Sequence, residues 1–282
     1  MTGASGQLGR EVAAVCVAAG DEVVALGHDA LDVSDRDAVH AAILGSAPQA
    51  VVHCAAWTEV DACESDPHRA FAANALGARH VAEASTRVGA HLLYVSTDYV
   101  FDGTKVGPYV EWDAAHPRTV YGRSKLGGEL EVQRLAPTAT IARTSWVCGA
   151  GGKNMVDTVL RLLEADPAAE LAFVDDQHGC PTFTADLAPS LRRLAAARLP
   201  GTFHVTNAGP TTWYGFVQAI VVAAGGSAEQ VRAITTAELE PPRPAPRPAN
   251  SVLDNLGLRL AGQPPLTHWS EPLERLVKEL KS

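Results

Sequence analysis

Residues 3–9 read Gly-Ala-Ser-Gly-Gln-Leu-Gly, and this stretch decides the fold class. Three glycines at this spacing, followed by helical periodicity over residues 7–19, are typical of the loop that holds the pyrophosphate of a dinucleotide. Gly3 would permit the tight turn, Gly6 would let the backbone approach the phosphates, and Gly9 would allow close helix packing. Free N–H groups at the helix N-terminus would attract the phosphates. A flexible terminus rich in glycine and serine is the alternative reading.

Beyond this loop, short apolar runs alternate with alanine-rich stretches of helical periodicity. Strands are predicted at residues 22–26, 50–54, 91–96 and 138–142, all buried, and helices at residues 35–44, 71–88 and 123–135. This alternation predicts an α/β fold with a doubly wound parallel sheet, which is Rossmann-like.

The alternation becomes looser beyond residue 145. Helices are expected at residues 154–163, 212–224 and 271–280, strands at 171–174 and 202–206, and a loop or an extended segment at the proline-rich residues 241–248. We therefore predict a dinucleotide-binding domain over residues 1–145. Residues 146–282 should form mainly a smaller C-terminal substrate-binding region, with some elements returning to the main sheet.

The start of the chain departs from this fold. A strand normally precedes the glycine-rich loop and lies centrally in the sheet, but only Met1 and Thr2 precede Gly3. A missing central strand would leave backbone groups of both neighbours unpaired, at about 1–3 kcal/mol per buried group. The sequence thus predicts a sheet without its first strand, and we favour a misplaced chain start over a natural loss.

Charge and cysteine content narrow the class of protein. A net charge of -9 argues against a nucleic-acid partner, because phosphate backbones are bound by basic patches. The longest apolar stretch, residues 12–19, is too short to span a bilayer, and no secretory leader is recognisable. Five cysteines without a CxxC pair indicate reduced thiols and no zinc site. We expect a soluble, cytoplasmic protein without a membrane partner.

Two further segments are candidates for cofactor contact. Asp32 and Val33 could meet the adenine ring, although Ser34 could equally be the N-cap of the helix that follows. Small residues at 54–56 (Cys54, Ala55 and Ala56) would let a cofactor lie against the backbone at the end of the third strand.

The choice between NADPH and NADH is left open by the sequence. No acidic residue ends the second predicted strand, where it would hold a ribose 2′-hydroxyl. No clear arginine is placed there for a 2′-phosphate either, and Arg10 is the nearest candidate.

The candidate catalytic residues lie near the fourth predicted strand and the helix after it. Tyr121 and Lys125 are four residues apart and would share one helix face. A neighbouring ammonium would lower the pKa of the phenol, which could then give a proton to a carbonyl as hydride arrives. Ser96 or Thr97 could orient that carbonyl. Taken alone, Tyr121 and Lys125 could be a pair on a helix surface, and Ser96 and Thr97 could simply form a turn at the end of a strand. Their combination with the glycine-rich loop predicts a short-chain reductase.

These residues resemble the extended short-chain dehydrogenases/reductases and, more narrowly, the dTDP-4-dehydrorhamnose reductase family. The resemblance covers nearly the whole chain. Its segments are residues 3–9, 55–64 (AAWTEVDACE), 96–103 (STDYVFDG), 121–125, 143–147 (RTSWV), 176–182 (DQHGCPT), 211–216 (TTWYGF) and 247–251 (RPANS). The departures are His178-Gly179-Cys180 within its segment and Val120 before the tyrosine.

The resemblance implies roles for particular residues. Tyr121 would be the proton donor, Thr97 would orient the carbonyl, and Lys125 would lower the pKa of Tyr121 and contact the ribose. The implied cofactor-binding residues are Gly3, Gly6, Gln7, Leu8, Gly9, Asp32, Val33, Cys54, Ala55, Ala56, Asn74, Tyr121 and Lys125. The implied substrate-binding residues are Asp98, Tyr99, Trp146, Gln177, Pro181, Thr182 and Arg247, with a core aromatic as the alternative for Trp146.

The implied reaction reduces the C4 keto group of dTDP-4-dehydro-L-rhamnose to dTDP-L-rhamnose with NADPH or NADH. Some family members form magnesium-dependent dimers, so Mg²⁺ and a homodimer are expected from the resemblance alone, and the sequence itself shows no metal-ligand cluster. A reductase for another dTDP-deoxysugar, such as the dihydrostreptose precursor, is the close alternative. A non-catalytic regulatory relative is the alternative from a different class.

Overall fold

The computed structural model describes residues 1–281, and four parallel strands form its central sheet. The strands are β1 (Ala50–His53), β2 (His91–Thr97), β3 (Thr140–Thr144) and β8 (Gly201–His204), in that order across the sheet. The prediction of a parallel α/β fold is confirmed.

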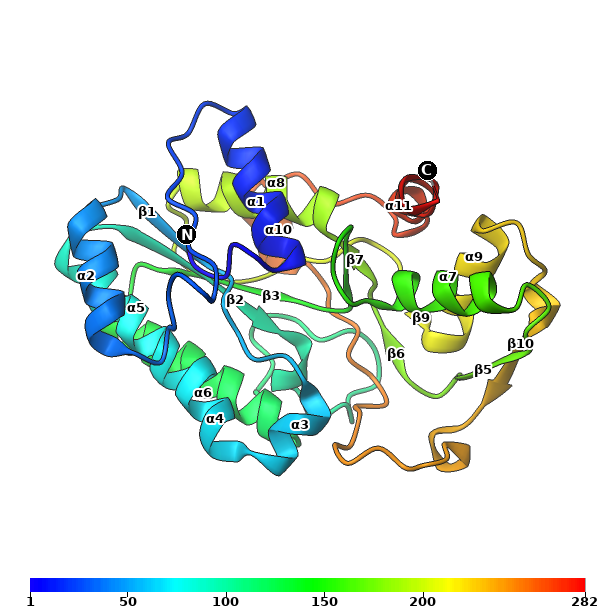
Figure 1. The fold of residues 1–282 in the computed structure, drawn as a ribbon. Coiled ribbons are helices and arrows are strands. Elements are labelled where there is room, and N and C mark those ends of the chain that lie inside the picture. The colour runs from blue at the N-terminus through cyan, green and yellow to red at the C-terminus, as the bar shows by residue number, and fades with distance from the viewer. Residues whose placement is uncertain (282) are drawn as a thin grey trace.

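Helices cover both faces of the sheet (Figure 1). On one face lie α1 (Gln7–Ala18) and α8 (Thr184–Ala196), which pack against each other, and on the other lie α2 (Arg36–Ser46), α5 (Gly77–Arg87) and α6 (Val120–Leu135). Leu92 and Leu93 of β2 belong to separate core clusters, because successive side chains of a strand point to opposite faces. Both faces are therefore buried, which explains the continuous apolar runs in the sequence.

The predicted strand at residues 22–26 is wrong. Only Leu26 forms a bridge, to Thr2, and Val24 is 48% exposed. Thr2 also bridges His53 of β1, and the Met1 amino group donates to the Val24 carbonyl at 2.6 Å. Met1 and Thr2 thus occupy the expected place of the first strand, and they are too few to pair with the whole of residues 22–26.

Two predicted helices differ from the structure by more than two residues at one end. The helix expected at residues 71–88 is divided into α4 (Pro67–Phe71), a π-helical turn (Ala72–Leu76) and α5. Helix α6 begins at Val120, capped by the Thr119 side chain, so that Tyr121 lies inside its first turn. The N-cap of α2 is Asp35 rather than Ser34, because Ser34 donates to the Asp32 carboxylate instead.

The smaller region has its own core. Strand β5 (Leu171–Val174) pairs with β10 (Val231–Ile234), β4 (Val147–Cys148) with β7 (Thr182–Phe183), and β6 (His178–Gly179) with β9 (Thr211–Thr212). Helices α7 (Met155–Ala165), α9 (Trp213–Ala223) and α11 (Ser270–Leu280) enclose a cluster that includes Phe216 and Trp269. The central sheet and its covering helices, including α8 and β8 from the second half of the chain, form the larger lobe. The short helices α3 (Val60–Ser65) and α10 (Leu256–Leu260) also pack in this lobe.

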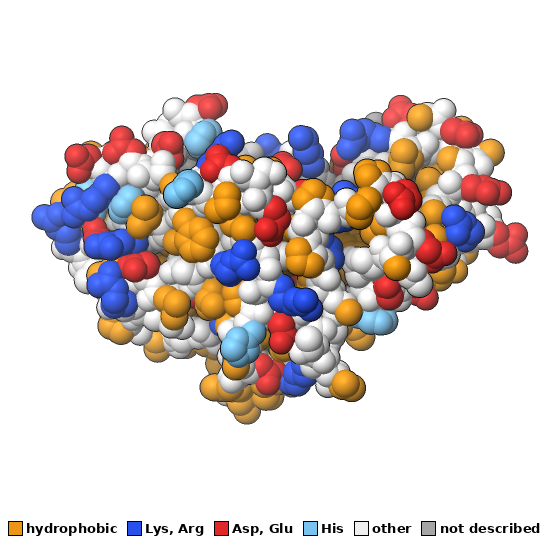
Figure 2. Space-filling view, turned by 90° about the horizontal axis from the view of Figure 1, so that it is seen from below, with side chains coloured by type: hydrophobic (Ala, Val, Ile, Leu, Met, Phe, Trp, Pro, Cys, Tyr) orange, Lys and Arg blue, Asp and Glu red, His pale blue; other side chains and the backbone are white. Residues whose placement is uncertain are grey.

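The face of the molecule in Figure 2 carries basic and acidic side chains interspersed with apolar ones. Within residues 1–281, no helix is long and apolar enough to cross a membrane.

A buried ion pair joins α6 to the central sheet. The Glu129 carboxylate accepts hydrogen bonds from Arg143 Nε at 2.9 Å and Nη2 at 2.7 Å, and from Ser96 Oγ at 2.5 Å. The Glu129 and Arg143 side chains are 1% and 7% exposed. Loss of one partner would leave the other charge buried and unpaired.

We expect Arg143→Ala to lower the free energy of unfolding by about 3–5 kcal/mol. The matched control is Arg134→Ala, which removes an α6 pair with Glu131 in which Arg134 is 56% exposed; it should cost less than about 1 kcal/mol. Urea unfolding followed by circular dichroism measures both. Equal losses in the two variants would contradict the assigned role of burial.

Candidate functional site

The glycine-rich loop runs between Thr2 and α1 and lies directly against the end of β1. Gly3 has a φ of 70°, and a Cβ atom there would stand 2.5 Å from the Ala55 backbone nitrogen. A Cβ on Gly9 would stand 2.1 Å from the Gly3 carbonyl oxygen. A side chain at either position would break these contacts, so the glycines hold the backbone where it can approach a phosphate.

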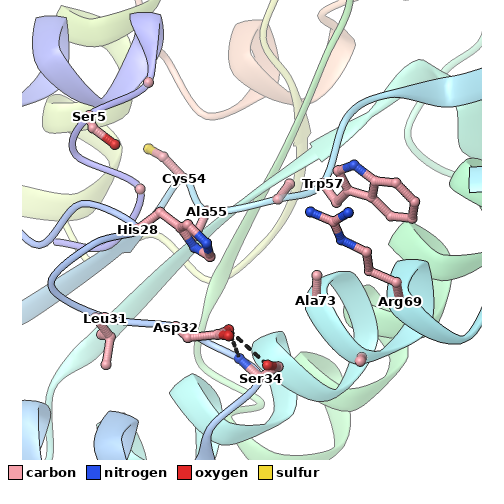
Figure 3. A pocket seen from close by; sticks show the side chains of 14 residues that line it. Ser5, His28, Leu31, Asp32, Ser34, Cys54, Ala55, Trp57, Arg69 and Ala73 are labelled. Carbon is pink, nitrogen blue, oxygen red and sulfur yellow. Dashed lines mark hydrogen bonds between the residues drawn. The ribbon is translucent and has the colours of Figure 1, made fainter. Parts of the chain in front are cut away.

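A cavity of about 460 Å³ opens beside this loop (Figure 3). Of the predicted cofactor residues, it is lined by Gly3, Gly6, Asp32, Cys54, Ala55 and Ala56. It is also lined by residues that were not predicted, namely Ser5, His28, Leu31, Ser34, Trp57, Arg69, Ala72 and Ala73. Its volume lies within the usual range of small-ligand pockets. The glycine-rich loop on one side and small residues such as Ala55 and Ala56 leave a space that could hold the adenosine and pyrophosphate portion of a dinucleotide.

Other predicted cofactor residues do not line this cavity. Leu8 and Val33 pack into the two core clusters on opposite faces of the sheet. Gln7 donates to the Val147 carbonyl at 3.1 Å and accepts from Asn154 at 3.2 Å. Gln7 therefore connects α1 to the smaller region.

Arg10 also reaches the smaller region. Its guanidinium donates to the carbonyl of Ser5 at 2.9 Å and to the carbonyl of Gly151. Arg10 is exposed and is not among the residues that line the cavity.

Asn74 lies in the π-helical turn and is 1% exposed. Its side chain accepts from the Trp57 backbone N–H at 2.8 Å and donates to the Trp57 carbonyl at 3.0 Å and to Ser124 Oγ at 2.9 Å. Asn74 thus fixes the loop after β1 against the first turns of α6.

The three predicted catalytic residues meet at the carboxyl end of β2. Thr97 is the last residue of that strand, and its hydroxyl lies within hydrogen-bond reach of the Tyr121 phenol. Lys125 is one helical turn further along α6, and its Nζ donates to the Val95 carbonyl at 2.8 Å. Gly122 makes this approach of α6 possible, since a Cβ there would stand 2.2 Å from the Tyr99 carbonyl oxygen.

Burial sets the protonation of Tyr121 and Lys125. It raises the pKa of Tyr121, and the hydrogen bond between Tyr121 and Thr97 lowers it in part. It lowers the pKa of Lys125 to about 7, and the nearby Glu129 carboxylate raises it in part. We expected Lys125 to lower the pKa of Tyr121, but desolvation of the phenol dominates and acts in the opposite direction. The phenol is therefore protonated at neutral pH, as a proton donor must be.

Asp98 is a buried carboxyl beside Thr97. It is 2% exposed, and its Oδ1 accepts from the Thr97 hydroxyl at 2.9 Å. Burial raises its pKa to about 6, and hydrogen bonds from Ser251 and Thr97 partly oppose this. Its Oδ2 has no hydrogen-bond partner within residues 1–281.

Two of the predicted substrate residues are aromatic, and they pack in different clusters of the structure. Tyr99 contacts Tyr121 edge to face, with ring centroids 5.6 Å apart. Trp146, just beyond β3, has a positive φ of 45° and stacks on Trp213 at 3.5 Å between ring centroids. Gly179 lies directly against the Trp146 ring, where a Cβ would stand 2.4 Å from it.

The remaining predicted substrate residues are occupied by contacts within the protein. Gln177 is 5% exposed and donates to Thr236 at 2.8 Å. Pro181 and Thr182 are buried, and Thr182 belongs to β7.

Arg247 is held by an acidic residue of α3. Its guanidinium contacts both carboxylate oxygens of Asp61, at 2.5 and 2.7 Å, and the Ala245 backbone N–H donates to the same carboxylate at 3.1 Å. Arg247 is close enough to Tyr99 to act on it electrostatically. The proline-rich segment is thus tied to the larger lobe next to the catalytic residues.

Sequence reasoning missed several residues of this site. Asp61 lies within the segment 55–64 and Glu129 within the helix predicted at residues 123–135, but the partner of each lies in another segment and no local pattern pairs them. His28 and Arg69 lie in no recognised motif. His28 could have been indicated only by its position after the strand predicted at residues 22–26, and Arg69 only by its nearness in sequence to Asn74. Within residues 1–281, no group of three or more His, Cys, Asp or Glu side chains is placed to hold a metal ion.

Comparisons with known proteins agree with this geometry. The family model "RmlD substrate binding domain" matches residues 1–282. A dTDP-4-dehydrorhamnose reductase from Streptomyces griseus is 47% identical over 279 residues, which are 97% of this chain and 90% of that protein.

Solved structures give the same result. The structure of a dTDP-4-dehydrorhamnose reductase from Clostridium acetobutylicum has a TM-score of 0.94 and 38% identity, and covers 100% of this chain and 98% of its own. The structure of the Bacillus anthracis dTDP-4-dehydrorhamnose reductase in complex with NADP has a TM-score of 0.94 and 37% identity, with 99% and 97% covered. This chain therefore belongs to the dTDP-4-dehydrorhamnose reductase family of the extended short-chain dehydrogenases/reductases.

Proposed function

We propose that this protein reduces the C4 keto group of dTDP-4-dehydro-L-rhamnose to form dTDP-L-rhamnose, with NADPH or NADH as the hydride donor. The observation that carries the proposal is the meeting of Thr97, Tyr121 and Lys125 at the carboxyl end of β2, in a chain whose glycine-rich loop lines a cavity. Ligands of open α/β sheets bind at this edge.

Gly3 and Gly6 would approach the cofactor pyrophosphate, Gly9 would keep α1 close to the loop, and Asp32, which lines the cavity, would accept from the adenine amino group. When bound, the reduced nicotinamide supplies the hydride that adds to the carbonyl carbon. Lys125 is placed beside Tyr121 on α6 and could donate to the cofactor ribose.

The chain's own residues would supply the proton. The Thr97 hydroxyl orients the carbonyl oxygen by a hydrogen bond, and Tyr121 Oη donates its proton to that oxygen as the carbon receives hydride. Tyr121 becomes a phenolate in this step, which the Lys125 ammonium stabilises until a proton from solvent restores the phenol. The product is a secondary alcohol, so that one hydride and one proton are added in total.

Polar and aromatic groups around this centre would bind the sugar. Asp98 Oδ2 is a buried acceptor without a partner within residues 1–281, and a sugar hydroxyl could satisfy it. Tyr99 and Trp146 would supply apolar walls, which suit the 6-deoxy methyl group of the substrate.

Tyr121→Phe should lower kcat by about 100-fold or more, because the proton donor is lost. The cofactor Kd should change little, since the variant keeps the aromatic ring. Oxidation of NADPH and NADH with dTDP-4-dehydro-L-rhamnose measures the first, and fluorescence titration measures the second. Tyr214→Phe is the matched control, because Tyr214 lies on α9 in the smaller region and its hydroxyl accepts a hydrogen bond from Gln218 at 2.7 Å. Full activity of Tyr121→Phe would refute the mechanism.

The pH dependence of kcat/KM should report Lys125. Burial lowers its pKa to about 7, so that the ammonium is present below this pH and is lost as the pH rises through it. We therefore expect kcat/KM to fall on the alkaline side of neutrality. Lys125→Met should have a lower kcat/KM that lacks this decline. A decline of the same midpoint in Lys125→Met would assign it to another group.

A further inference from the structure

Two segments that serve different parts of the molecule are bonded directly to each other. The glycine-rich loop passes into α1 at Gln7, and the chain beyond Trp146 leads to the start of α7 at Asn154. Gln7 Nε2 donates to the Val147 carbonyl at 3.1 Å, and Gln7 Oε1 accepts from Asn154 Nδ2 at 3.2 Å. One amide side chain thus holds both ends of the segment 147–154.

The contact leaves no room for side chains on the facing loop. A Cβ on Gly152 would stand 2.6 Å from Gln7 Cβ, and a Cβ on Gly151 would stand 2.8 Å from Arg10 Nη2. Gly151 has a φ of 69°, a conformation that favours glycine, and its carbonyl accepts from Arg10. The loop before α7 is therefore fitted to the first turn of α1 by shape as well as by hydrogen bonds.

Asn154 joins this loop to α7. Its Oδ1 accepts from the Asp157 backbone N–H at 3.1 Å and so caps the helix. Its Nδ2 faces three acceptors, which are Gln7 Oε1 and the carbonyls of Gly149 at 2.8 Å and Gly152 at 3.0 Å. A displacement of Gln7 would therefore act on the loop and on the start of the helix together.

The segment also leads to the aromatic side of the proposed sugar site. Trp146 directly precedes Val147 and stacks on Trp213 of α9, the helix against which α7 packs. Trp146 has a φ of 45°, a region that bulky residues rarely adopt, so the position of its ring depends on how the following peptide is held. Gln7 holds that peptide through the Val147 carbonyl.

A dinucleotide would act on the other side of Gln7. The first backbone N–H groups of α1 have no partner within the helix, and a helix start of this kind is where a phosphate binds. A phosphate held there would fix Gln7 relative to the loop. Ordering a segment through one ligand lowers the cost of ordering it through a second ligand, which couples the two affinities.

We propose that Gln7 and Asn154 are positioning residues that couple the two sites, so that a cofactor on the glycine-rich loop tightens the binding of a sugar nucleotide beside Trp146. The inference rests on the proposed function for the identity of the two ligands. It requires no contact of either side chain with a ligand, because the effect passes through the segment 147–154. By linkage, the sugar nucleotide must tighten the binding of the cofactor by the same factor.

The test measures the Kd of dTDP-L-rhamnose by isothermal titration, without cofactor and with saturating NADPH or NADH. These ligands cannot react with each other, because the sugar and the nicotinamide are both already reduced. The unaltered protein should bind dTDP-L-rhamnose about fivefold or more tightly when the cofactor is present. Gln7→Met removes both hydrogen bonds at similar side-chain volume. It should lower this factor to about twofold or less, and the Kd of the cofactor alone should change by about twofold at most.

Asn154→Ser tests the second partner. Serine can still cap α7, but it is too short to reach Gln7, so the same loss of coupling is expected. The double variant should lose no more than either single variant, because both substitutions break one contact.

The matched control is Gln230→Met. Gln230 also donates one hydrogen bond and accepts one, to the Pro167 carbonyl at 2.8 Å and from the Ser227 backbone N–H at 2.8 Å, elsewhere in the smaller region. Its coupling factor should equal that of the unaltered protein. Thermal unfolding checks that every variant is folded.

Hydrogen exchange provides a readout that needs no sugar nucleotide. The cofactor should slow exchange of the backbone amides of residues 147–155 in the unaltered protein and in Gln230→Met, but not in Gln7→Met. Absence of coupling in the unaltered protein, or equal coupling in Gln7→Met, would overturn the inference and leave the proposed function intact. Protection by the cofactor in a protein that does not bind dTDP-L-rhamnose would support the contact through Gln7 and contradict the proposed substrate.

Discussion

The arrangement of the catalytic residues depends on one close contact between α6 and the end of β2. Gly122 lies against the Tyr99 carbonyl with no room for a side chain, and this brings the first turns of the helix to the strand end. Tyr121 and Lys125 flank that contact, and both become buried by it. The Glu129–Arg143 pair holds the same helix to the sheet one turn later. The close contact between α6 and the end of β2 thus determines both where Tyr121 and Lys125 lie and how deeply they are buried. Burial in turn raises the pKa of the Tyr121 phenol and keeps it protonated.

The parallel sheet was predictable because a buried strand is apolar along its whole length, and that pattern is local. Residues 22–26 carry the same pattern, but a strand also needs a partner for its backbone, and the pattern contains no information on whether the partner exists. The start of α6 at Val120 depended on the Thr119 cap, which is a local signal that was overlooked. The π-helical turn around Asn74 depends on long-range hydrogen bonds to Trp57 and Ser124, so no local signal describes it.

The residues of the candidate site were predictable where they lie in short sequence motifs. The motifs indicated Thr97, Tyr121 and Lys125, and the structure brings these three together. They also indicated residues such as Gln7 and Arg247, whose side chains are bonded to other parts of the chain in this structure. A motif indicates that a residue is important for structure or function. Only the tertiary structure shows whether its side chain is free to contact a ligand or instead holds two regions of the chain together. His28 and Arg69, which also line the cavity, belong to no motif, because they come from two separate segments of the chain.

The course of the chain through the two lobes has a consequence for how the molecule can be divided. After β3 the chain enters the smaller region, returns to the main sheet through α8 and β8, and then leaves it again. Helix α8 covers one face of the sheet, and its Leu187 and Leu191 are fully buried there. A fragment that ended at residue 145 would lose this helix and an edge strand, and only α1 would remain to cover that apolar face of the sheet. The two regions are therefore interleaved along the chain, and a gene fusion that exchanged the smaller region would need at least three junctions.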